Sequence, residues 1–135
     1  MIRNRQGQSL WQLRDEGIAE FPGQWGLFGG GIEPGESPQQ AIQRELKEEL
    51  NLELAQPLVL LQTIVLERWI LHCFYVNLPG GLQGLQLHEG QDWGFFDDDE
   101  VATHWLRSPS LQEDRGICPP LTEVWHQVQP LLPQP

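Results

Sequence analysis

The sequence predicts a single α/β domain in which helices cover the faces of a β-sheet. A chain of 135 residues has the usual length of one domain. Two runs rich in Val, Ile, Leu and aromatic residues predict strands, and a capped stretch with helical periodicity precedes them. The predicted order of strand, helix, strands, helix and helix is typical of layered α/β domains. We therefore expect one domain over residues 1–135.

The composition argues against several classes of protein. The net charge is −11, with 19 acidic residues against 8 Lys plus Arg, whereas sequence-independent binding of nucleic acid needs a positive surface. No run of about 18 apolar residues predicts a membrane-spanning helix. We expect a cytoplasmic location, because the N-terminus lacks the apolar middle of a signal peptide. An anionic substrate would need a cation to mediate its contact with so acidic a protein.

The two cysteines predict no metal or disulfide site. Cys73 lies in the apolar run 71–76 and is expected to be a buried thiol, and Cys118 has no histidine at a zinc-ligand spacing. A disulfide is not expected in a cytosolic chain.

The first predicted strand covers residues 9–14 and begins close to the N-terminus. Only residues 1–5 remain for an earlier strand, and their composition is poor for one. Two alternatives follow: a shortened or mis-assigned start, or an edge strand supplied by a partner in a homodimer.

A loop is predicted over residues 15–26, because glycines and a Pro-Gly pair interrupt it. Residues 25–28 predict a short strand that leads into three consecutive glycines, Gly29 to Gly31. Such a turn is either simply flexible or a place where the backbone approaches another group closely. The capped helix that follows favours the second interpretation.

The helix over residues 38–50 has the strongest local signals in the chain. Ser37 suits the N-cap, Pro38 suits the first helical position, and Gln40 completes a capping box. Asn51 follows the last helical residue and tolerates the left-handed conformation in which many helices end.

The remaining elements are predicted from shorter patterns. Residues 58–67 and 70–78 predict neighbouring strands joined at residues 68–69. Residues 82–87 fit a strand or a loop equally well. The other expected elements are a strand over 93–96, a short helix from the acidic run 97–100 to about 104, an irregular segment over 106–120, a helix over 121–129 and a flexible tail over 130–135.

Three glutamates on the predicted helix 38–50 lie beside its apolar stripe. At about 100° per residue, the stripe consists of Ile42, Leu46 and Leu50, and the carboxylates of Glu45, Glu48 and Glu49 fall within an arc of roughly 100° next to it. Like charges on one helix face repel each other.

Two interpretations of these carboxylates remain open. Arg44 could pair with Glu48 or with Glu36, and Lys47 is a further partner on a solvated acidic face. Alternatively, the excess charge could hold a hard divalent cation, since Mg²⁺ takes oxygen ligands from carboxylates and substrate phosphates.

The spacing of these residues resembles the Nudix box, G-x5-E-x7-R-E-U-x-E-E-x-G-U. Eight of its nine fixed positions match this chain, and the exception is Asn51 in place of the last glycine. Since Asn supplies a helix-ending backbone at small steric cost and carries no catalytic atom of the motif, we expect activity to survive this departure. The matching positions are Gly30, Glu36, Arg44, Glu45, Leu46, Glu48, Glu49 and Leu52.

The resemblance implies an α/β/α sandwich around a mixed sheet and a hydrolytic activity. It implies Mg²⁺- or Mn²⁺-dependent attack of water at phosphorus in a nucleoside diphosphate linked to another group, as in a nucleoside triphosphate, a nucleotide sugar or ADP-ribose. The implied metal ligands are Glu45, Glu48 and Glu49, joined by the backbone carbonyl of Gly30. Arg44 and Glu36 would orient these carboxylates, which places Arg44, Glu45 and Glu49 among the expected catalytic residues.

The general base and the substrate contacts are less fully specified. Glu45 is one candidate base, and Glu89 in the polar loop 88–91 is another, against the alternative of an exposed loop acid. Arg14 could contact phosphate or form a surface salt bridge. Trp25, close to the glycine turn, could stack on a base, while the other five tryptophans are expected to pack in or against the core.

Two other classes of function remain as alternatives. One is a catalytically idle nucleotide-binding or regulatory module, and the other is an isomerase on the same scaffold. The complete set of three glutamates argues against the idle module, and the isomerase rests on analogy of fold alone.

Overall fold

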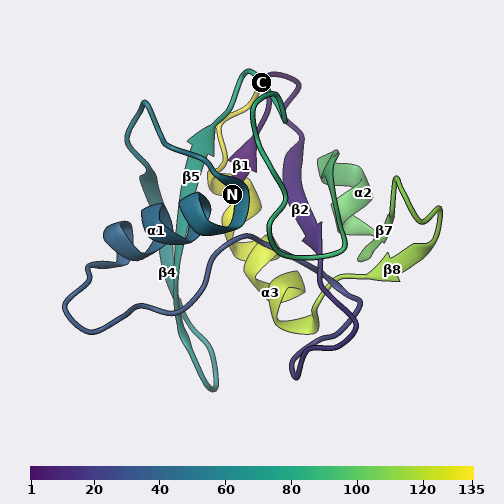
Figure 1. Cartoon of the computed structure of the whole chain (residues 1–135), viewed down its shortest axis with the longest axis horizontal. Coiled ribbons are helices and arrows are strands. Elements are labelled where there is room, and N and C mark those ends of the chain that lie inside the picture. Colours follow the sequence, from purple (N-terminus) through teal and green to yellow (C-terminus); the bar gives the residue numbers. More distant parts are fainter.

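The structure, a computed structural model, describes residues 1–135 and contains a mixed six-stranded sheet. The strands run in the order β3-β2-β1-β5-β4, and β6 pairs with β2 (Figure 1). Their bounds are β1 Ile2–Arg3, β2 Ser9–Leu13, β3 Trp25–Gly26, β4 Val59–Val65, β5 Ile70–Asn77 and β6 Asp92–Phe96.

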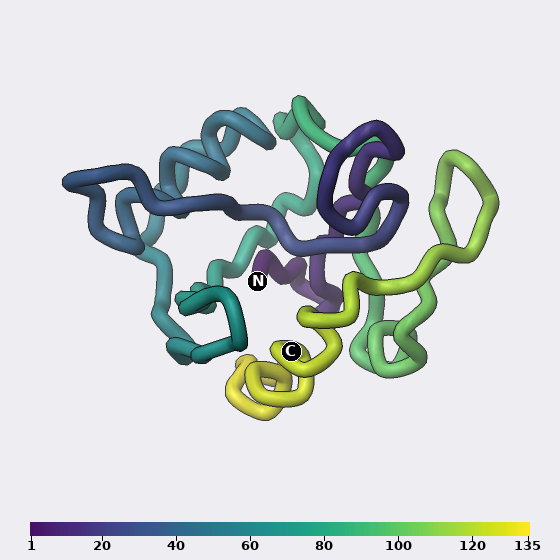
Figure 2. Tube along the Cα trace, turned by 90° about the horizontal axis from the view of Figure 1, so that it is seen from below, coloured from purple at the N-terminus to yellow at the C-terminus, as the bar shows by residue number.

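Two long helices lie on opposite sides of the sheet, as seen from below (Figure 2). The helices are α1 Pro38–Leu50, α2 Asp98–Ala102 and α3 Pro119–Val128, with a short 3₁₀ turn η1 over Gln129–Leu131. The apolar residues of α1 pack with Phe74 and Val76 of β5, whereas those of α3 pack with Cys73 from the other face of the same strand. The α/β/α layering predicted from the sequence is therefore confirmed. No helix is long and apolar enough to cross a bilayer.

The helix α1 begins and ends where the sequence predicts. Ser37 accepts from the backbone of Gln40, whose side chain accepts from the Ser37 backbone, so the capping box is formed. Asn51 has φ 54° and ψ 35°, the left-handed conformation expected of it. Leu46 and Leu50 are buried and Ile42 packs against the same cluster. This burial fixes the rotation of the helix and thereby the direction of its carboxylates.

Three short strands are not predicted correctly from the sequence. Residues 1–5 do contain a strand, because β1 pairs antiparallel with β2 and parallel with β5. The segment 106–120 is not irregular, since β7 Trp105–Arg107 and β8 Asp114–Gly116 form an antiparallel hairpin. Strands of two or three residues depend on their partners and leave little pattern in the sequence.

The C-terminal part also differs from its prediction. The helix α3 begins at Pro119 rather than at residue 121, because proline suits the first turn of a helix. The segment 130–135 is predicted to form a flexible tail; in the structure its first two residues belong to η1, and Leu132 is buried in the cluster that contains Trp11 and Trp125. The ambiguous segment 82–87 contains no strand.

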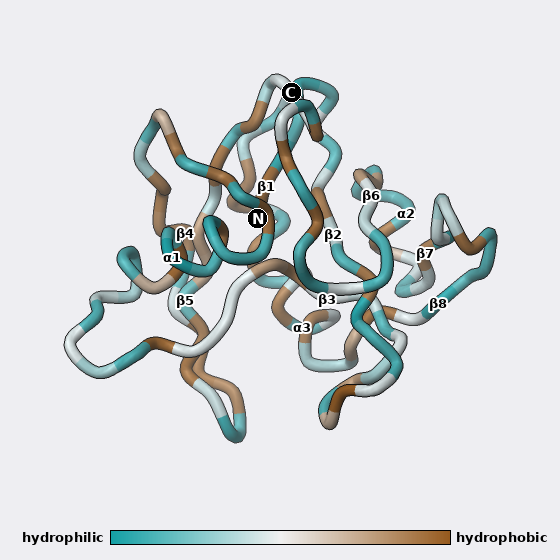
Figure 3. The backbone as a smooth tube through the Cα atoms, viewed as in Figure 1, coloured by the Kyte–Doolittle hydropathy of each residue, from teal (hydrophilic) through white to brown (hydrophobic).

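The hairpin of β4 and β5 carries apolar residues as far as its turn (Figure 3). The strands are neighbours, as predicted, and the Leu66 N–H donates to the Trp69 carbonyl across the turn. Several of these residues remain exposed: Val59, Leu60, Val65, Trp69 and Ile70. The strand β4 is also the last of the sheet, so this hairpin presents an apolar edge.

Candidate active site

The glycine turn packs directly on the carboxylates of α1. A Cβ atom added to Gly30 would lie 2.4 Å from Oε1 of Glu45, much closer than a side-chain carbon tolerates. The backbone N–H of Gly29 donates to Oε2 of Glu49 at 3.1 Å. The absence of a side chain at position 30 therefore allows the turn and the two carboxylates to share one small space.

Arg44 lies at the centre of an ionic network between the turn and the helix. Its Nε donates to Oε2 of Glu36 at 2.8 Å and its Nη2 to Oε1 of the same carboxylate at 3.0 Å, so the pair is bidentate. Its Nη1 donates to Glu45 at 3.0 Å and to Glu48 at 3.3 Å. Nη2 also donates to the carbonyl of Gly31 at 3.0 Å. The sequence leaves open whether Arg44 pairs with Glu36 or with Glu48, and the structure forms both pairs.

This network favours the charged forms of both Arg44 and Glu36. Hydrogen bonds from Arg44 lower the pKa of Glu36, and the backbone N–H of Glu33 adds to that effect. The bond to Glu36 in turn raises the pKa of Arg44 above its already high value. Both groups therefore remain charged at neutral pH.

Glu49 is the one glutamate of the helix that is buried, with 3% of its surface exposed. Burial, together with the nearby carboxylates of Glu89 and Glu45, raises the pKa of Glu49 to about 9, although the hydrogen bond from the Gly29 N–H acts in the opposite direction. It has no Lys or Arg partner, in contrast to Glu45 and Glu48. A buried carboxylate surrounded by other carboxylates is a position at which a cation would be stabilised.

Glu89 is brought to this position by a loop that is tied to α1 and β2. The His88 N–H donates to the Glu49 carbonyl at 2.8 Å, and the Gln91 N–H donates to the Leu13 carbonyl at 2.8 Å. Glu89 is an exposed loop residue, and its carboxyl lies near enough to that of Glu49 to raise the pKa of Glu49. The loop acid therefore lies at the carboxylate cluster, although its role as a base stays a prediction.

The carboxylates suit a hard cation in chemistry, but they do not form a closed ligand set as they stand. No three His, Cys, Asp or Glu side chains converge on one point, because Glu45 and Glu48 turn toward Arg44 and Glu49 turns toward Gly29. The oxygen donors, the excess of negative charge and the space at Gly30 that a Cβ would fill all fit Mg²⁺ or Mn²⁺. To bind an ion, the carboxylates of Glu45 and Glu48 would have to move away from the Nη1 atom of Arg44.

The two predicted substrate contacts have different outcomes. Arg14 lies at the wall of a cavity beside the glycine turn, where its Nε donates to the Glu20 carbonyl at 3.2 Å. The prediction that Trp25 contacts a base is wrong, because its side chain is 0% exposed. The indole donates to the Leu106 carbonyl at 2.9 Å and packs edge-on against Phe96. Pairing of β3 with β2 directs Trp25 into the core.

The surface positions of two other tryptophans also differ from prediction. Trp105 is 62% exposed and Trp69 is 42% exposed, although both are predicted to pack. Trp69 stands at the turn between β4 and β5 and borders the same cavity as Arg14.

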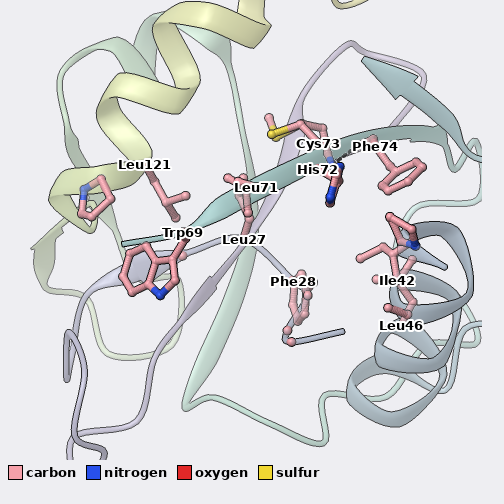
Figure 4. A pocket seen from close by; sticks show the side chains of 18 of the residues that line it. Leu27, Phe28, Ile42, Leu46, Trp69, Leu71, His72, Cys73, Phe74 and Leu121 are labelled. Carbon is pink, nitrogen blue, oxygen red and sulfur yellow. Dashed lines mark hydrogen bonds between the residues drawn. The ribbon is translucent and has the colours of Figure 1, made fainter. Parts of the chain in front are cut away.

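This cavity, of about 630 Å³, is the site feature that the sequence does not predict. It extends from the glycine turn along β5 to the start of α3, and most of its lining is apolar (Figure 4). The only hint in the sequence is Phe28, an apolar residue directly before the glycines. The lining comes from segments far apart in the chain: Leu27, Phe28, Ile42, Trp69, His72, Phe74 and Leu121.

The fold and the site together define an α/β/α domain whose glutamate-bearing helix packs against a glycine turn. A protein-family model described as the NUDIX domain matches residues 1–118. The chain belongs to the Nudix family.

The chain is similar to several known proteins of this family. It is 46% identical over 55 residues to the nucleoside triphosphatase NudI of Escherichia coli. That match covers 40% of this chain and 38% of the relative's length, so it spans well under half of either protein.

Solved structures support the fold. The likeness to a Deinococcus radiodurans protein covers 94% of this chain and 78% of the other, with a TM-score of 0.75 and 18% identity. The NUDIX domain of Shewanella oneidensis NrtR, solved with ADP ribose, gives a TM-score of 0.60 at 20% identity over 90% of this chain and 79% of the other.

Proposed function

We propose that the protein is a metal-dependent pyrophosphohydrolase that cleaves a nucleoside diphosphate linked to another group. The observation that carries the proposal is the buried Glu49 carboxylate, which lies beside Glu45 and Glu89 without a cationic side chain. Family membership and the similarity of a 55-residue stretch to a nucleoside triphosphatase support the same conclusion. Nucleoside triphosphates are accordingly the first substrates to test.

Some of these residues would bind the ion, and others would orient the residues that bind it. Glu45, Glu48 and Glu49 would hold Mg²⁺ or Mn²⁺ together with the carbonyl of Gly30. Such an ion neutralises phosphate charge and lowers the pKa of the attacking water. Arg44, itself fixed by Glu36, restrains Glu45 and Glu48 by donating a hydrogen bond to each. This arrangement explains how a protein with a net charge of −11 binds an anion.

Glu89 is our proposed general base. Its carboxyl lies at the cluster without being part of α1, so it would take the proton of the attacking water while the helix carboxylates hold the ion. The loop bonds at His88 and Gln91 hold it there.

A substrate panel tests the activity. The protein is incubated with nucleoside triphosphates, nucleotide sugars, ADP-ribose and dinucleotide cofactors, once with Mg²⁺ and once with a chelator. We expect release of a nucleoside monophosphate from at least one of them only when Mg²⁺ is present. Binding of nucleotides without turnover of any would instead establish the catalytically idle module.

A further inference from the structure

The loop that carries Glu89 is held by hydrogen bonds from the two residues that follow it. The Gly90 N–H donates to Oδ2 of Asp15 at 3.3 Å. The side-chain amide of Gln91 donates to Oε1 of Glu16 at 3.2 Å. Both acceptors belong to the loop between β2 and β3, so the place of Glu89 depends on the place of that second loop.

Arg115 of β8 holds the loop between β2 and β3. Its Nη1 donates to Oε1 of Glu16 at 2.7 Å and to the Gly23 carbonyl at 3.1 Å. Its Nε and Nη2 donate to the Glu113 carboxylate at 3.1 and 2.8 Å, which fixes the plane of the guanidinium. A Cβ atom added to Gly23 would lie 2.6 Å from Nη1. The guanidinium therefore lies in space that only a glycine at position 23 leaves open.

The carboxylate of Glu16 joins these two sets of contacts. Its Oε1 accepts both from Arg115 and from Gln91. The hydrogen bond from Arg115, and after it the one from Gln91, lowers the pKa of Glu16. The hydrogen bond to Glu16, followed by that to Glu113, raises the pKa of Arg115. Gln91 thus donates to a charged acceptor, which gives a stronger hydrogen bond than a neutral one.

Arg115 itself does not reach the carboxylates of α1. Its ion pairs are with Glu16 and Glu113, and it does not line the cavity beside the glycine turn. Any effect of Arg115 on the chemistry must therefore act through the residues that it holds.

We propose that Arg115 and Glu16 are positioning residues for Glu89. Through Gln91 they hold its loop where the Glu89 carboxyl lies at the carboxylates of α1. The proposal rests on the hydrolase function proposed above, with Glu89 as its base. An exposed loop acid loses its place easily, because loops are the more mobile parts of a protein. A displacement of about 1 Å from the productive geometry can lower a rate by up to about 100-fold.

Steady-state kinetics of an Arg115 variant test the proposal. In Arg115→Met we expect kcat for the nucleoside triphosphate that is hydrolysed fastest to fall about tenfold. KM should stay within about twofold, because the base moves while the groups that bind the ion and the substrate do not. Arg107→Met is the matched control, since Arg107 forms its ion pair at 3.3 Å with Asp114 of the same hairpin. Equal kcat values in the two variants, or a loss confined to KM, would overturn the proposal.

The same change in a Glu89→Gln background distinguishes positioning from a general disturbance of the fold. If Arg115 acts through Glu89, Arg115→Met should lower kcat by less than about twofold once that carboxylate is absent. Arg115→Lys retains a cation for Glu16 without the planar fork of donors, so it should recover part of the lost kcat. A full tenfold loss in the Glu89→Gln background would show that Arg115 acts by another route and would overturn the proposal.

Amide hydrogen exchange of the metal-free protein tests the positioning without any catalysis. We expect the amides of Gly90 and Gln91 to exchange at least about threefold faster in Arg115→Met than in Arg107→Met. Equal exchange at these amides would overturn the positioning role and leave the hydrolase function intact. Failure of the wild type to hydrolyse any compound of the substrate panel in Mg²⁺ would overturn both.

Discussion

At the scale of single residues, Glu49 links stability to function. A carboxylate that is buried among other carboxylates costs folding free energy, and natural proteins accept such positions mainly at functional sites. Burial raises the pKa of Glu49 to about 9, so the metal-free fold favours its protonated form. A bound cation would reverse this preference, because it favours the carboxylate.

This position predicts an unusual dependence of stability on pH. Since the pKa of Glu49 is higher in the folded state, the folded protein retains a proton that the unfolded chain releases. The free energy of unfolding of the metal-free protein should therefore fall from about pH 5 to pH 9 and then level off. We expect Glu49→Gln to lack most of this decline and to be about 1–3 kcal/mol more stable at pH 8.

Urea unfolding at several pH values, with chelator present, measures this effect. Excess Mg²⁺ should stabilise the wild type at pH 8 more than it stabilises Glu49→Gln. A variant that is less stable than the wild type throughout this pH range would contradict the account of Glu49.

Gly30 provides a second prediction at the residue scale. In Gly30→Ala the new methyl group would meet Glu45 at 2.4 Å, so the carboxylate must move. We expect roughly tenfold weaker binding of Mn²⁺, measured by titration with detection of the free ion by electron paramagnetic resonance. Gly31→Ala is the control, because a Cβ atom there meets nothing within 4 Å. Equal losses in the two variants would place the metal elsewhere.

At the scale of elements, the sequence predicts α1 well because its signals are local. The capping box at Ser37, the apolar stripe and the left-handed Asn51 all lie within one continuous stretch. The predicted metal residues lie on the same helix and turn, so their grouping follows from helical geometry alone. In contrast, β1, β7 and β8 are defined by pairing with distant partners.

Trp25 illustrates where prediction from local pattern fails. Trp25 is close in sequence to the glycine turn, but the pairing of β3 with β2 directs its side chain into the core. We expect Trp25→Phe to lower the free energy of unfolding by about 1–3 kcal/mol, because the Leu106 carbonyl loses its donor. The KM for substrate should stay unchanged.

Thermal unfolding and steady-state kinetics of the same variant check both expectations. Trp105→Phe is the matched control, since that side chain is largely exposed and should tolerate the change. A raised KM in Trp25→Phe at unchanged stability would restore the stacking role that we reject.

At the scale of the whole molecule, the acidic helix and the apolar cavity meet at the glycine turn. In our proposal the carboxylates on α1 hold an anionic group through a cation, and the cavity along β5 adjoins that position. The cavity could not be predicted from the sequence, because its walls come from the first strands, α1, the β4–β5 hairpin and the start of α3. Only the folded chain brings these segments together.

The apolar edge at β4 is the other feature of the whole molecule. Val59, Leu60 and Val65 are exposed on the last strand of the sheet. The homodimer that the sequence leaves open stays a prediction, and sedimentation velocity at several protein concentrations distinguishes it from a monomer.

The central claim is that the glutamates of α1 hold a cation at which water hydrolyses a diphosphate linkage. Phosphorus NMR of a nucleoside triphosphate incubated with the protein in ¹⁸O-labelled water tests it most directly. With Mg²⁺ we expect a nucleoside monophosphate to form, with a single ¹⁸O atom on one of the two products. With chelator we expect no reaction. The rate should fall by about 100-fold in Glu89→Gln, which loses the proposed base, and by considerably more in Glu49→Gln, which loses a ligand of the ion. Equal losses in these two variants, or hydrolysis that continues in chelator, would contradict the account.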